Sequence, residues 1–259
     1  MQHLKSKPWL VLFFLLSLAG CSTSPKTPQL EERPINIKDP YEKWNRKVFY
    51  FNEGVDAWVL KPIAQGYRFI TPKFVRKGVN NFFSNLGEVS DFANNLLQFK
   101  PLEAGKDLAR FTINSTLGIA GLFDVATPMT GLQKSNEDFG QTLNTWGVPE
   151  GSYIVWPFLG GKTLSHSISL PMDYYYLNPI PYLVDSNEVS LGLSALQIVQ
   201  LREEFLDAEG LIQGDRYSFI RDAYLQRRTF LVNDGRLESD PFLEDDDFDF
   251  NFDEADFAD

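Results

Sequence analysis

The sequence predicts an all-α fold, and three observations carry this prediction. Helix-start signals recur along the chain, because Asp39-Pro40, Thr71-Pro72 and Asp215 place capping residues or prolines where helices begin. Apolar residues follow these signals at spacings of three and four, the period of an amphipathic helix. The predicted helices are short and closely spaced, so they are expected to pack as antiparallel neighbours joined by glycine- and proline-rich aromatic loops.

The first helix is predicted to run from Pro40 to about Leu60. Its apolar stripe consists of Trp44, Val48, Phe51, Val55 and Trp58. Pro62 is expected to end this helix, because proline lacks the backbone N–H that a helix interior needs.

Three further helices are expected before residue 118. The second begins after Thr71-Pro72 and breaks at Gly78 or Gly87, and the third begins near Ser90. A fourth opens at Pro101. On this fourth helix the predicted apolar side carries Leu108, Phe111 and Leu117, and another side carries Lys106, Asp107 and Arg110.

The middle of the chain is less regular. The apolar run 118–123 contains two glycines and predicts a close helix contact or a buried turn. Glycine and proline are dense over residues 127–161, where 152–157 could form a short strand. The aromatic residues of this region are Phe139, Trp146, Tyr153, Trp156 and Phe158. They suit either an interfacial belt at a bilayer boundary or a protein core, and composition slightly favours the core.

Two longer helices close the body. One is expected from Asn187 to about Ala208, with Gly210 after its end. The other runs from Tyr217 to about Val232, and Asp215 caps it. The folded body is predicted to end at Gly235.

Residues 1–20 have the layout of a secretory signal, with Lys5 and Lys7 before an apolar run that ends in small residues. Eleven apolar-dominated positions, Trp9 to Ala19, make only about 16 Å of helix, which is too short to span a bilayer. Leu18-Ala19-Gly20-Cys21 resembles a bacterial lipobox, so we expect cleavage before Cys21 and lipidation of that cysteine. An ordinary signal peptide with an incidental cysteine is the alternative. Ser22 is typical of lipoproteins that move on to the outer membrane.

The charge of the chain is concentrated at its end. Residues 236–259 hold eleven carboxylates against one arginine, whereas residues 21–235 carry a net charge of only −3. We predict four segments: a signal peptide over 1–20, a flexible tether over 21–38, a helical domain over 39–235, and a disordered acidic and aromatic tail over 236–259. The tail suits either a solubilising terminus or a partner-binding arm.

No pattern in the chain supports catalysis, a metal site or nucleic-acid binding. The acidic mature chain lacks the basic surface that phosphate backbones require. One cysteine and one mature histidine cannot build a zinc site, and no phosphate-binding or dinucleotide motif occurs. His166 lies between Ser165 and Ser167 without a nucleophile elbow, and the pairs Glu137-Asp138 and Glu203-Glu204 suit a helix cap or solvated face better than acid–base work. We therefore expect no enzyme and no cofactor.

The residues from 39 to 235 carry a more specific pattern. The matching motifs are Asp39-Pro40-Tyr41-Glu42, Trp44-Asn45-Arg46, Gly78-Val79-Asn80-Asn81-Phe82, Asn114-Ser115-Thr116-Leu117-Gly118, Gly121-Leu122-Phe123-Asp124-Val125-Ala126 and Glu137-Asp138-Phe139-Gly140-Gln141-Thr142-Leu143. With these motifs the chain resembles the MlaA (VacJ) lipoproteins. It departs at Ser165-His166, where members often carry Arg-Asp, and its acidic tail is not a family feature.

The resemblance implies an all-α ring embedded in the inner leaflet of the outer membrane, facing the periplasm. Its amphipathic channel would remove mislocalised phospholipids from the outer leaflet and pass them to a periplasmic lipid-shuttle protein, in association with a trimeric porin. Polar residues in the matching apolar segments are the candidates for the lipid path, with helix capping or helix-to-helix hydrogen bonding as the alternative: Asn52, Asn81, Asn114 and Thr116. Two alternatives remain for the function: a scaffold lipoprotein that organises envelope partners through its acidic tail, and, more remotely, a phospholipase centred on His166.

Overall fold

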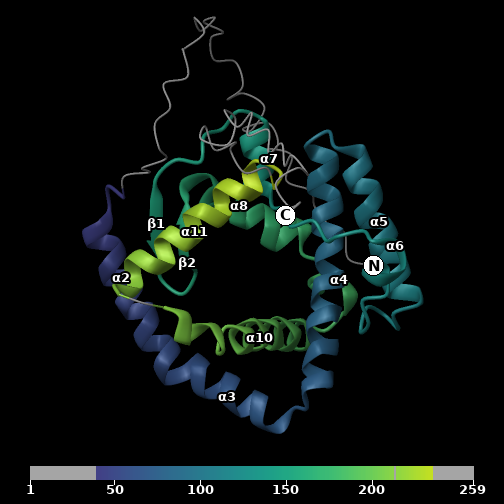
Figure 1. The fold of residues 1–259 in the computed structure, drawn as a ribbon, viewed down its shortest axis with the longest axis horizontal. Coiled ribbons are helices and arrows are strands. Elements are labelled where there is room, and N and C mark those ends of the chain that lie inside the picture. The colour runs from purple at the N-terminus through teal and green to yellow at the C-terminus, as the bar shows by residue number, and fades with distance from the viewer. Residues whose placement is uncertain (1–38, 213, 236–259) are drawn as a thin grey trace, which may run out of the picture. The chain divides into compact units, whose positions relative to one another are not determined.

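The computed structural model describes residues 39–212 and 214–235, and most of these residues are helical, as the sequence predicts (Figure 1). The helices in chain order are α2 (Glu42–Val55), the π-helix η1 (Asp56–Leu60), α3 (Lys61–Ile70), α4 (Lys73–Leu97), α5 (Pro101–Thr116), α6 (Ala126–Thr130), α7 (Phe139–Thr145), α8 (Leu164–Met172), the π-helix η2 (Asp173–Leu177), α9 (Ile180–Leu183), α10 (Asn187–Glu204), the 3₁₀-helix η3 (Ala208–Leu211) and α11 (Arg216–Val232). The predicted signal peptide, Cys21, the tether and the acidic tail lie outside the described residues.

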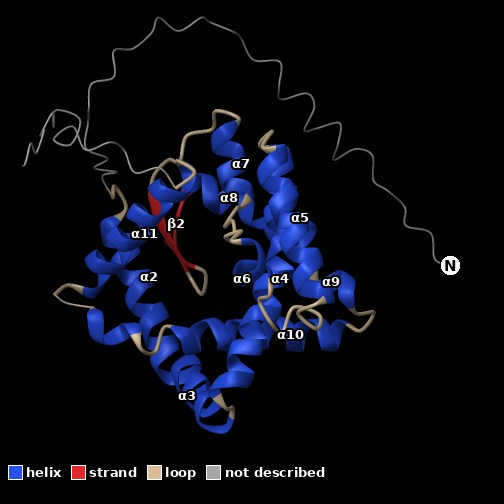
Figure 2. Ribbon diagram, turned by 45° about the vertical axis from the view of Figure 1, so that its right-hand side comes forward, coloured by secondary structure: helices blue, strands red, loops and turns tan. Residues whose placement is uncertain are grey.

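A short hairpin interrupts the helical chain (Figure 2). Strand β1 (Tyr153–Trp156) pairs antiparallel with β2 (Gly160–Thr163), and Tyr153 lies opposite Thr163. The strand expected over 152–157 is therefore confirmed. Helix α2 holds β1 from one side, because the Asn45 amide donates to the Tyr153 carbonyl at 3.1 Å and accepts from the Val155 N–H at 2.8 Å.

The elements of the described unit form a closed circuit of contacts. Helix α2 packs on the hairpin, the hairpin on α8, α8 on α7, and α7 on α4. From α4 the circuit continues through α10 to α3, and from α3 through η1 back to α2. Figure 1 shows α2 and α4 on opposite sides of this circuit, with α10 and α3 below and α8 and α11 above. The helices thus form the ring that the resemblance implies.

Pro62 does not end the first helical run, contrary to the prediction from the sequence. The chain passes from α2 through the π-helix η1 into α3, and Pro62 occupies the first turn of α3. Proline is tolerated where the bonding pattern restarts, because its missing N–H falls among groups that have no regular α-helical partner. The run therefore ends at Ile70, ten residues later than expected.

The predicted breaks at Gly78, Gly87 and Ser90 are also absent, since α4 is one helix of 25 residues. An isolated glycine costs a helix only about 1 kcal/mol, which tertiary packing easily offsets. Both glycines lie at close contacts. A Cβ at Gly78 would meet the Leu122 carbonyl at 3.7 Å, and one at Gly87 would meet the Lys134 ammonium at 3.2 Å. Each glycine thus allows another segment of the chain to lie close to α4, and neither glycine ends the helix.

Helix α5 begins at Pro101 as predicted, but the burial of its two faces is reversed. Asp107 is 0 % exposed and Arg110 is 3 % exposed, whereas Leu108 of the expected apolar side is 50 % exposed. Among the described residues, buried polar or charged residues outnumber buried apolar ones. The interior between α4 and α5 is therefore built from hydrogen bonds and ion pairs, and much apolar surface is left outside.

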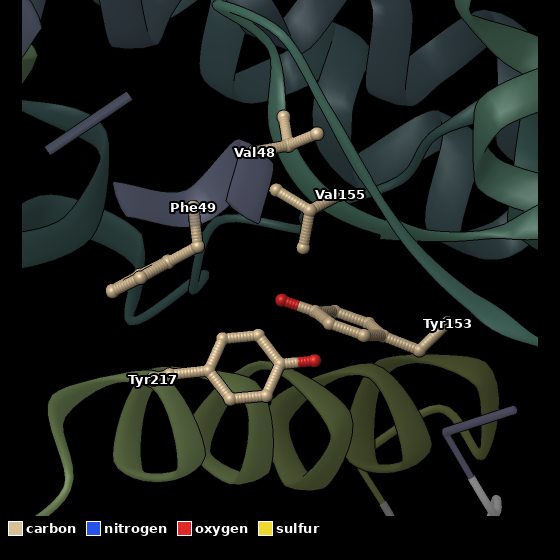
Figure 3. Packing of buried hydrophobic residues seen from close by; sticks show 5 residues of the cluster. All are labelled: Val48, Phe49, Tyr153, Val155 and Tyr217. Atoms are coloured by element: carbon tan, nitrogen blue, oxygen red, sulfur yellow. The ribbon is translucent and has the colours of Figure 1, made fainter. Parts of the chain in front are cut away.

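Two small apolar clusters complete the interior. The first joins α2, the hairpin and α11 through Val48, Phe49, Tyr153, Val155 and Tyr217, whose side chains converge in Figure 3. The second joins α4, α9 and α10 through Phe83, Leu86 and Ile180. Each cluster fixes one part of the circuit, so the hairpin side and the α4–α10 side have separate apolar anchors.

Residues 118–123 form a turn, as expected, but apart from its two glycines the turn is exposed rather than buried, and Ile119 is 63 % exposed. Ile119, Ala120 and Gly121 all have positive φ angles, of 53°, 55° and 86°. Gly121 also lies against Asn85, because a Cβ there would come within 2.7 Å of the Asn85 amide nitrogen. A residue with a side chain would have to displace Asn85 from its place between α4 and α5.

Candidate lipid-binding site between α4 and α10

Two adjoining cavities lie along α4, on the side that packs against α10, α9 and η2. Their volumes are about 220 and 290 Å³, and Phe83, Gly87 and Gln197 line both of them. Together they approach the size range of small-molecule sites in proteins. The second apolar cluster forms part of their walls, because Phe83, Leu86 and Ile180 belong to it.

The lining of these cavities combines two kinds of side chain. The apolar residues are Phe83, Leu86, Leu170, Leu177, Pro179, Ile180 and Leu201. The amide and hydroxyl residues are Asn80, Ser84, Ser90, Tyr174, Asn178, Gln197 and Gln200. A ligand with both apolar and polar parts could be held here without burying unpaired polar groups against hydrocarbon, which is costly.

Lys134 supplies the positive charge of the smaller cavity. Its ammonium lies over Gly87 and donates to the Asp91 carboxylate at 2.6 Å and to the Ser84 carbonyl at 3.1 Å. A third N–H remains after these two bonds, since an ammonium has three donors. The side chain of Lys134 is partly exposed, whereas that of Asp91 is almost fully buried. The cavity therefore presents an ammonium whose counter-charge lies behind it.

A buried polar network holds the segment that carries Lys134 against α4 and α5. Asp91 also accepts from the Glu137 N–H at 2.8 Å, and Ser135 donates to Asp107 of α5. Burial raises the pKa of Asp91 to about 6, against the opposing effect of Lys134. Asp91 thus binds both ends of the segment 134–137, through Lys134 and through the Glu137 N–H.

The network continues into the α4–α5 interface. Arg110 donates to Glu88 at 2.8 Å, to the Thr127 hydroxyl at 2.8 Å and to the Leu132 carbonyl at 2.7 Å. Burial raises the pKa of Glu88, and Lys134 and Arg110 oppose this rise. Arg110 therefore neutralises Glu88 and also orients the start of the Lys134 segment.

Asp173 supplies a negative charge to the larger cavity. Its carboxylate accepts from the Phe139 N–H at 2.9 Å and from the Ser169 hydroxyl at 3.0 Å. Burial raises the pKa of Asp173 to about 6, and these two hydrogen bonds only partly oppose it. Asp173 is the first residue of the π-helix η2, and its side chain lies in the wall of the larger cavity.

A second feature of the molecule is an exposed apolar surface that we call the α3 stripe: Trp58, Val59, Ile63, Phe69, Ile70 and Phe74. Trp58 is 85 % exposed and Phe69 is 91 % exposed. Contiguous exposed apolar surfaces mark contact sites for protein or membrane. No helix within 39–212 and 214–235 combines the length and the apolarity that crossing a bilayer requires.

Hydrogen bonds to the backbone engage the four residues that the resemblance suggested for the lipid path. The Asn52 amide donates to the Trp156 carbonyl and accepts from the Phe158 N–H at the hairpin turn. Asn81 donates to the Leu122 carbonyl at 3.0 Å. Asn114 accepts from the N–H groups of Val125 and Ala126, and Thr116 donates within its own helix to Thr112. They lie on α2, α4 and α5 and do not form one cluster. Their role in a lipid path stays a prediction.

The contacts of His166 are to groups other than its neighbouring serines. Its Nδ1 lies 3.0 Å from the Tyr224 hydroxyl and its Nε2 lies 3.4 Å from the Lys162 ammonium. Burial, and next to it the charge of Lys162, lowers the pKa of His166 to about 4. The Ser165 hydroxyl donates to the Gly140 carbonyl and the Ser167 hydroxyl to the Thr163 carbonyl. This arrangement ties α8 to α7, the hairpin and α11.

The acidic pairs singled out from the sequence have structural partners. Asp138 caps α7 by accepting from the Gln141 N–H at 2.9 Å, and Glu137 accepts from Gln98 at 2.7 Å. Glu203 binds Arg68 at 2.7 Å and joins α10 to α3. Asp138 is thus a helix cap, as predicted, whereas Glu203 is buried in an ion pair between two helices and does not lie on a solvated face.

Sequence reasoning missed the cavity residues themselves. The sequence pattern singles out none of Lys134, Asp173 and Gln197. Gly87 was the available signal, because an unbroken amphipathic helix with a glycine on one face indicates close approach of another group. The group that approaches, the Lys134 ammonium, comes from 47 positions further along the chain and could not be identified from local pattern.

Comparisons with known proteins bear on the same region. The family model described as MlaA lipoprotein matches residues 37–231. An intermembrane phospholipid transport system lipoprotein, MlaA, of Haemophilus influenzae is 35 % identical over 240 residues, or 91 % of this chain and 94 % of its own. The protein of the same name from Escherichia coli is 33 % identical over 226 residues, or 85 % and 86 % of the two chains.

A solved structure gives the same result for the fold. It concerns the structural basis for maintenance of bacterial outer membrane lipid asymmetry, and it matches with a TM-score of 0.65 at 34 % sequence identity. The match covers 76 % of this chain and all of the solved chain. The match to the family model, over residues 37–231, includes α4, α9 and α10, the helices around the two cavities.

Proposed function

The chain belongs to the MlaA lipoprotein family, and on that premise we propose that it removes mislocalised phospholipids from the outer leaflet of the outer membrane and passes them to a periplasmic lipid carrier. The observation that carries this proposal is the pair of cavities between α4 and α10. Their walls alternate between apolar side chains and amides or hydroxyls. A phospholipid has the same two kinds of surface.

The chemistry needed for such transport is modest. The lipid must slide past the protein while its acyl chains stay against apolar wall and its head stays hydrogen-bonded. Phe83 and Leu86 offer the first kind of contact, and Ser90 and Gln197 offer the second. No bond has to be broken, so the function requires positioning and a path rather than a nucleophile.

The α3 stripe supports a location in the membrane. A side chain such as Phe69, fully exposed on a helix surface, is stabilised by about 1.5–3 kcal/mol when it is buried in an apolar phase. The stripe continues from η1 through α3 to the start of α4, and one side of the ring would thus rest among acyl chains. We propose that the domain sits in the inner leaflet of the outer membrane, facing the periplasm, and that lipidated Cys21 anchors it there.

The partners follow from the route of the cargo. The relatives are named for an intermembrane transport system, and a phospholipid that leaves one membrane needs a carrier to cross an aqueous space. A periplasmic shuttle protein is therefore part of the proposal. The family resemblance implies a trimeric porin as a further partner.

The test is the amount of phospholipid in the outer leaflet of cells that lack this protein. Cells complemented with the full chain are compared with cells that carry Cys21→Ala. We expect outer-leaflet phospholipid to accumulate in the deletion and to be cleared only by the anchored chain. Parental levels in every strain, including strains in which other lipid-removal systems are deleted, would show that the protein does not remove phospholipid.

The scaffold alternative rests on residues 236–259, which lie outside the described residues. Deletion of residues 237–259 separates it from the transport proposal in the same cells. A lipid path confined to the helical domain survives this deletion with normal clearance. Loss of clearance together with loss of a bound envelope partner would instead favour the scaffold.

A further inference from the structure

The charges around the two cavities are not balanced. Lys134 is the cation that lines the smaller cavity, and Asp173 is the anion that lines the larger one. Behind Lys134 lie the carboxylates of Asp91, at 2.6 Å from its ammonium, and of Glu88, at 3.9 Å. Arg110 compensates Glu88 at 2.8 Å. Asp91, Glu88 and Asp173 thus contribute three negative charges against Lys134 and Arg110, and Arg110 also lies 3.7 Å from Asp124. The more distant Arg228 acts on Asp173 without forming an ion pair with it.

From this arrangement we propose that the cavities select phospholipids with a zwitterionic head over those with a net anionic head. The inference rests on the proposed function and names the lipid class of the same site. The phosphate of the head binds the Lys134 ammonium, and the cationic group of the head is stabilised by the surrounding carboxylates. A head without that cationic group brings only negative charge to a site that already has an excess of it.

The position of Lys134 suits a phosphate. Gly87 lines both cavities and leaves space for the ammonium, because a Cβ at this position would lie 3.2 Å from Nζ. The hydrogen bonds to Asp91 and Ser84 hold the ammonium in place, and its third N–H is left for a ligand. Lysine commonly binds phosphate oxygens in this way, as a point charge.

The positions of the carboxylates suit a cation. Asp173 lies in the wall of the larger cavity, next to Asn178 and Tyr174, and accepts hydrogen bonds without any cationic partner among the described residues. Its burial, together with that of Asp91, weakens solvent screening, so each charge acts over several ångströms. The negative field therefore extends across the space that a lipid head would occupy.

Asp173→Asn is the variant that removes this field with the least disturbance. An asparagine oxygen can still accept from the Phe139 N–H. The Ser169 hydroxyl can turn its proton to the His166 carbonyl, 2.9 Å away, and accept from the new amide. Lys134→Gln removes the phosphate ligand. The matched controls are Asp222→Asn on α11 and Lys106→Gln on α5, both exposed and both away from the cavities.

The experiment uses the full chain, purified from membranes in detergent and incubated at pH 7.5 with equal amounts of phosphatidylethanolamine and phosphatidylglycerol. Bound lipid is extracted and quantified by mass spectrometry. We expect the unmodified chain to bind more phosphatidylethanolamine. Asp173→Asn is expected to shift the ratio toward phosphatidylglycerol by at least about fivefold, the effect of one unit charge about 4 Å away when it is screened as in bulk water. Lys134→Gln is expected to lower the binding of both lipids, and the controls are expected to match the unmodified chain.

The outcomes separate the two proposals. Equal binding of both lipids, or a ratio that Asp173→Asn leaves unchanged, would overturn the head-group preference and leave phospholipid transport standing. Binding of neither lipid by the unmodified chain would overturn the proposed function and the preference together. Because the readout is a ratio within one sample, a partial loss of folded protein does not imitate the expected shift.

Discussion

The α3 stripe and the α4–α5 interface are built in opposite ways. On the stripe, large apolar side chains such as Trp58 and Phe69 face outward. In the interface, the charged side chains of Asp107 and Arg110 face inward: Arg110 pairs with Glu88, and Asp107 accepts hydrogen bonds from Asn95 and Ser135. A water-soluble helical domain normally shows the reverse on both counts. This reversal is one of the observations that support the proposed location of the domain in the membrane.

The largest expected effect comes from breaking the polar interior. Arg110→Met leaves Glu88 buried without its 2.8 Å partner and removes the bonds to Thr127 and Leu132. We expect the free energy of unfolding to fall by about 3–5 kcal/mol, measured by chemical denaturation in detergent. The control Lys106→Met lies on the same helix and is expected to change it by less than about 0.5 kcal/mol.

A second variant separates lost charge pairing from lost packing. In the double variant Glu88→Gln with Arg110→Met, no unpaired carboxylate is left at this position, so we expect it to be more stable than Arg110→Met alone. A double variant that is less stable than the single one would show that Glu88 is not the group that Arg110 neutralises.

The next effect concerns the outward apolar surface. Phe69→Ser, made in a Cys21→Ala chain so that an anchor does not mask the result, is expected to weaken binding to phospholipid vesicles by about 2 kcal/mol, or roughly thirtyfold. The measurement is co-flotation with vesicles of outer-membrane phospholipid composition. Gln226→Ser, on an exposed polar position of α11, serves as the control. Equal flotation of all three chains would mean that the stripe does not contact lipid.

A smaller effect concerns pH and the wall of the larger cavity. The folded pKa of Asp173, about 6, lies above its unfolded value, so the folded chain binds the proton more tightly. Stability from this group is therefore present at low pH and is lost as pH rises from about 4 to about 6. We expect Asp173→Asn to gain about 1–2 kcal/mol relative to the unmodified chain between pH 4 and pH 7.

Denaturation midpoints at a series of pH values measure this difference. Asp222→Asn is the control, because Asp222 is half exposed on α11. A stability difference between Asp173→Asn and the unmodified chain that stays constant from pH 4 to pH 7 would contradict the raised pKa.

The smallest effect distinguishes the two glycines of α4. Gly78→Ala places its Cβ at an ordinary contact distance from Leu122, so it is expected to raise the free energy of unfolding by up to about 1 kcal/mol. Gly87→Ala is expected to show no such gain, because its Cβ would press on the Lys134 ammonium at 3.2 Å. Thermal unfolding of the two variants measures the difference, and an equal gain at both positions would remove the special role given to Gly87.

Much of the fold could be predicted from the sequence because local signals set it. Asp215 caps α11 and Pro101 opens α5 where expected, and the hairpin strand lies within the predicted run. These features depend on residues near in sequence. The helix ends predicted at Pro62, Gly78 and Gly87 were wrong. The π-helix η1 and the contacts from Leu122 and Lys134 outweigh the local tendency of proline and glycine to end a helix.

The candidate site could not be predicted in the same way. Apolar periodicity identifies the two sides of a helix but not which side is buried, and in α5 the polar side carrying Asp107 and Arg110 is the inner one. The cavity brings together residues of α4, α10, η2 and the segment after α6. Family resemblance indicated the fold and the class of cargo, but it pointed to Asn52, Asn81, Asn114 and Thr116 rather than to Lys134 and Gln197.

The central claim is that phospholipid occupies the space between α4 and α10, and site-specific photo-crosslinking in living cells tests it most directly. A benzophenone side chain at position 197, which lines both cavities, is compared with one at exposed position 226 of α11. After illumination, mass spectrometry of the purified chain detects lipid adducts. We predict a phospholipid adduct at position 197 and none at position 226. No adduct at position 197, while a benzophenone at Phe69 in the α3 stripe still captures lipid, would contradict an internal path and confine phospholipid to the outer surface.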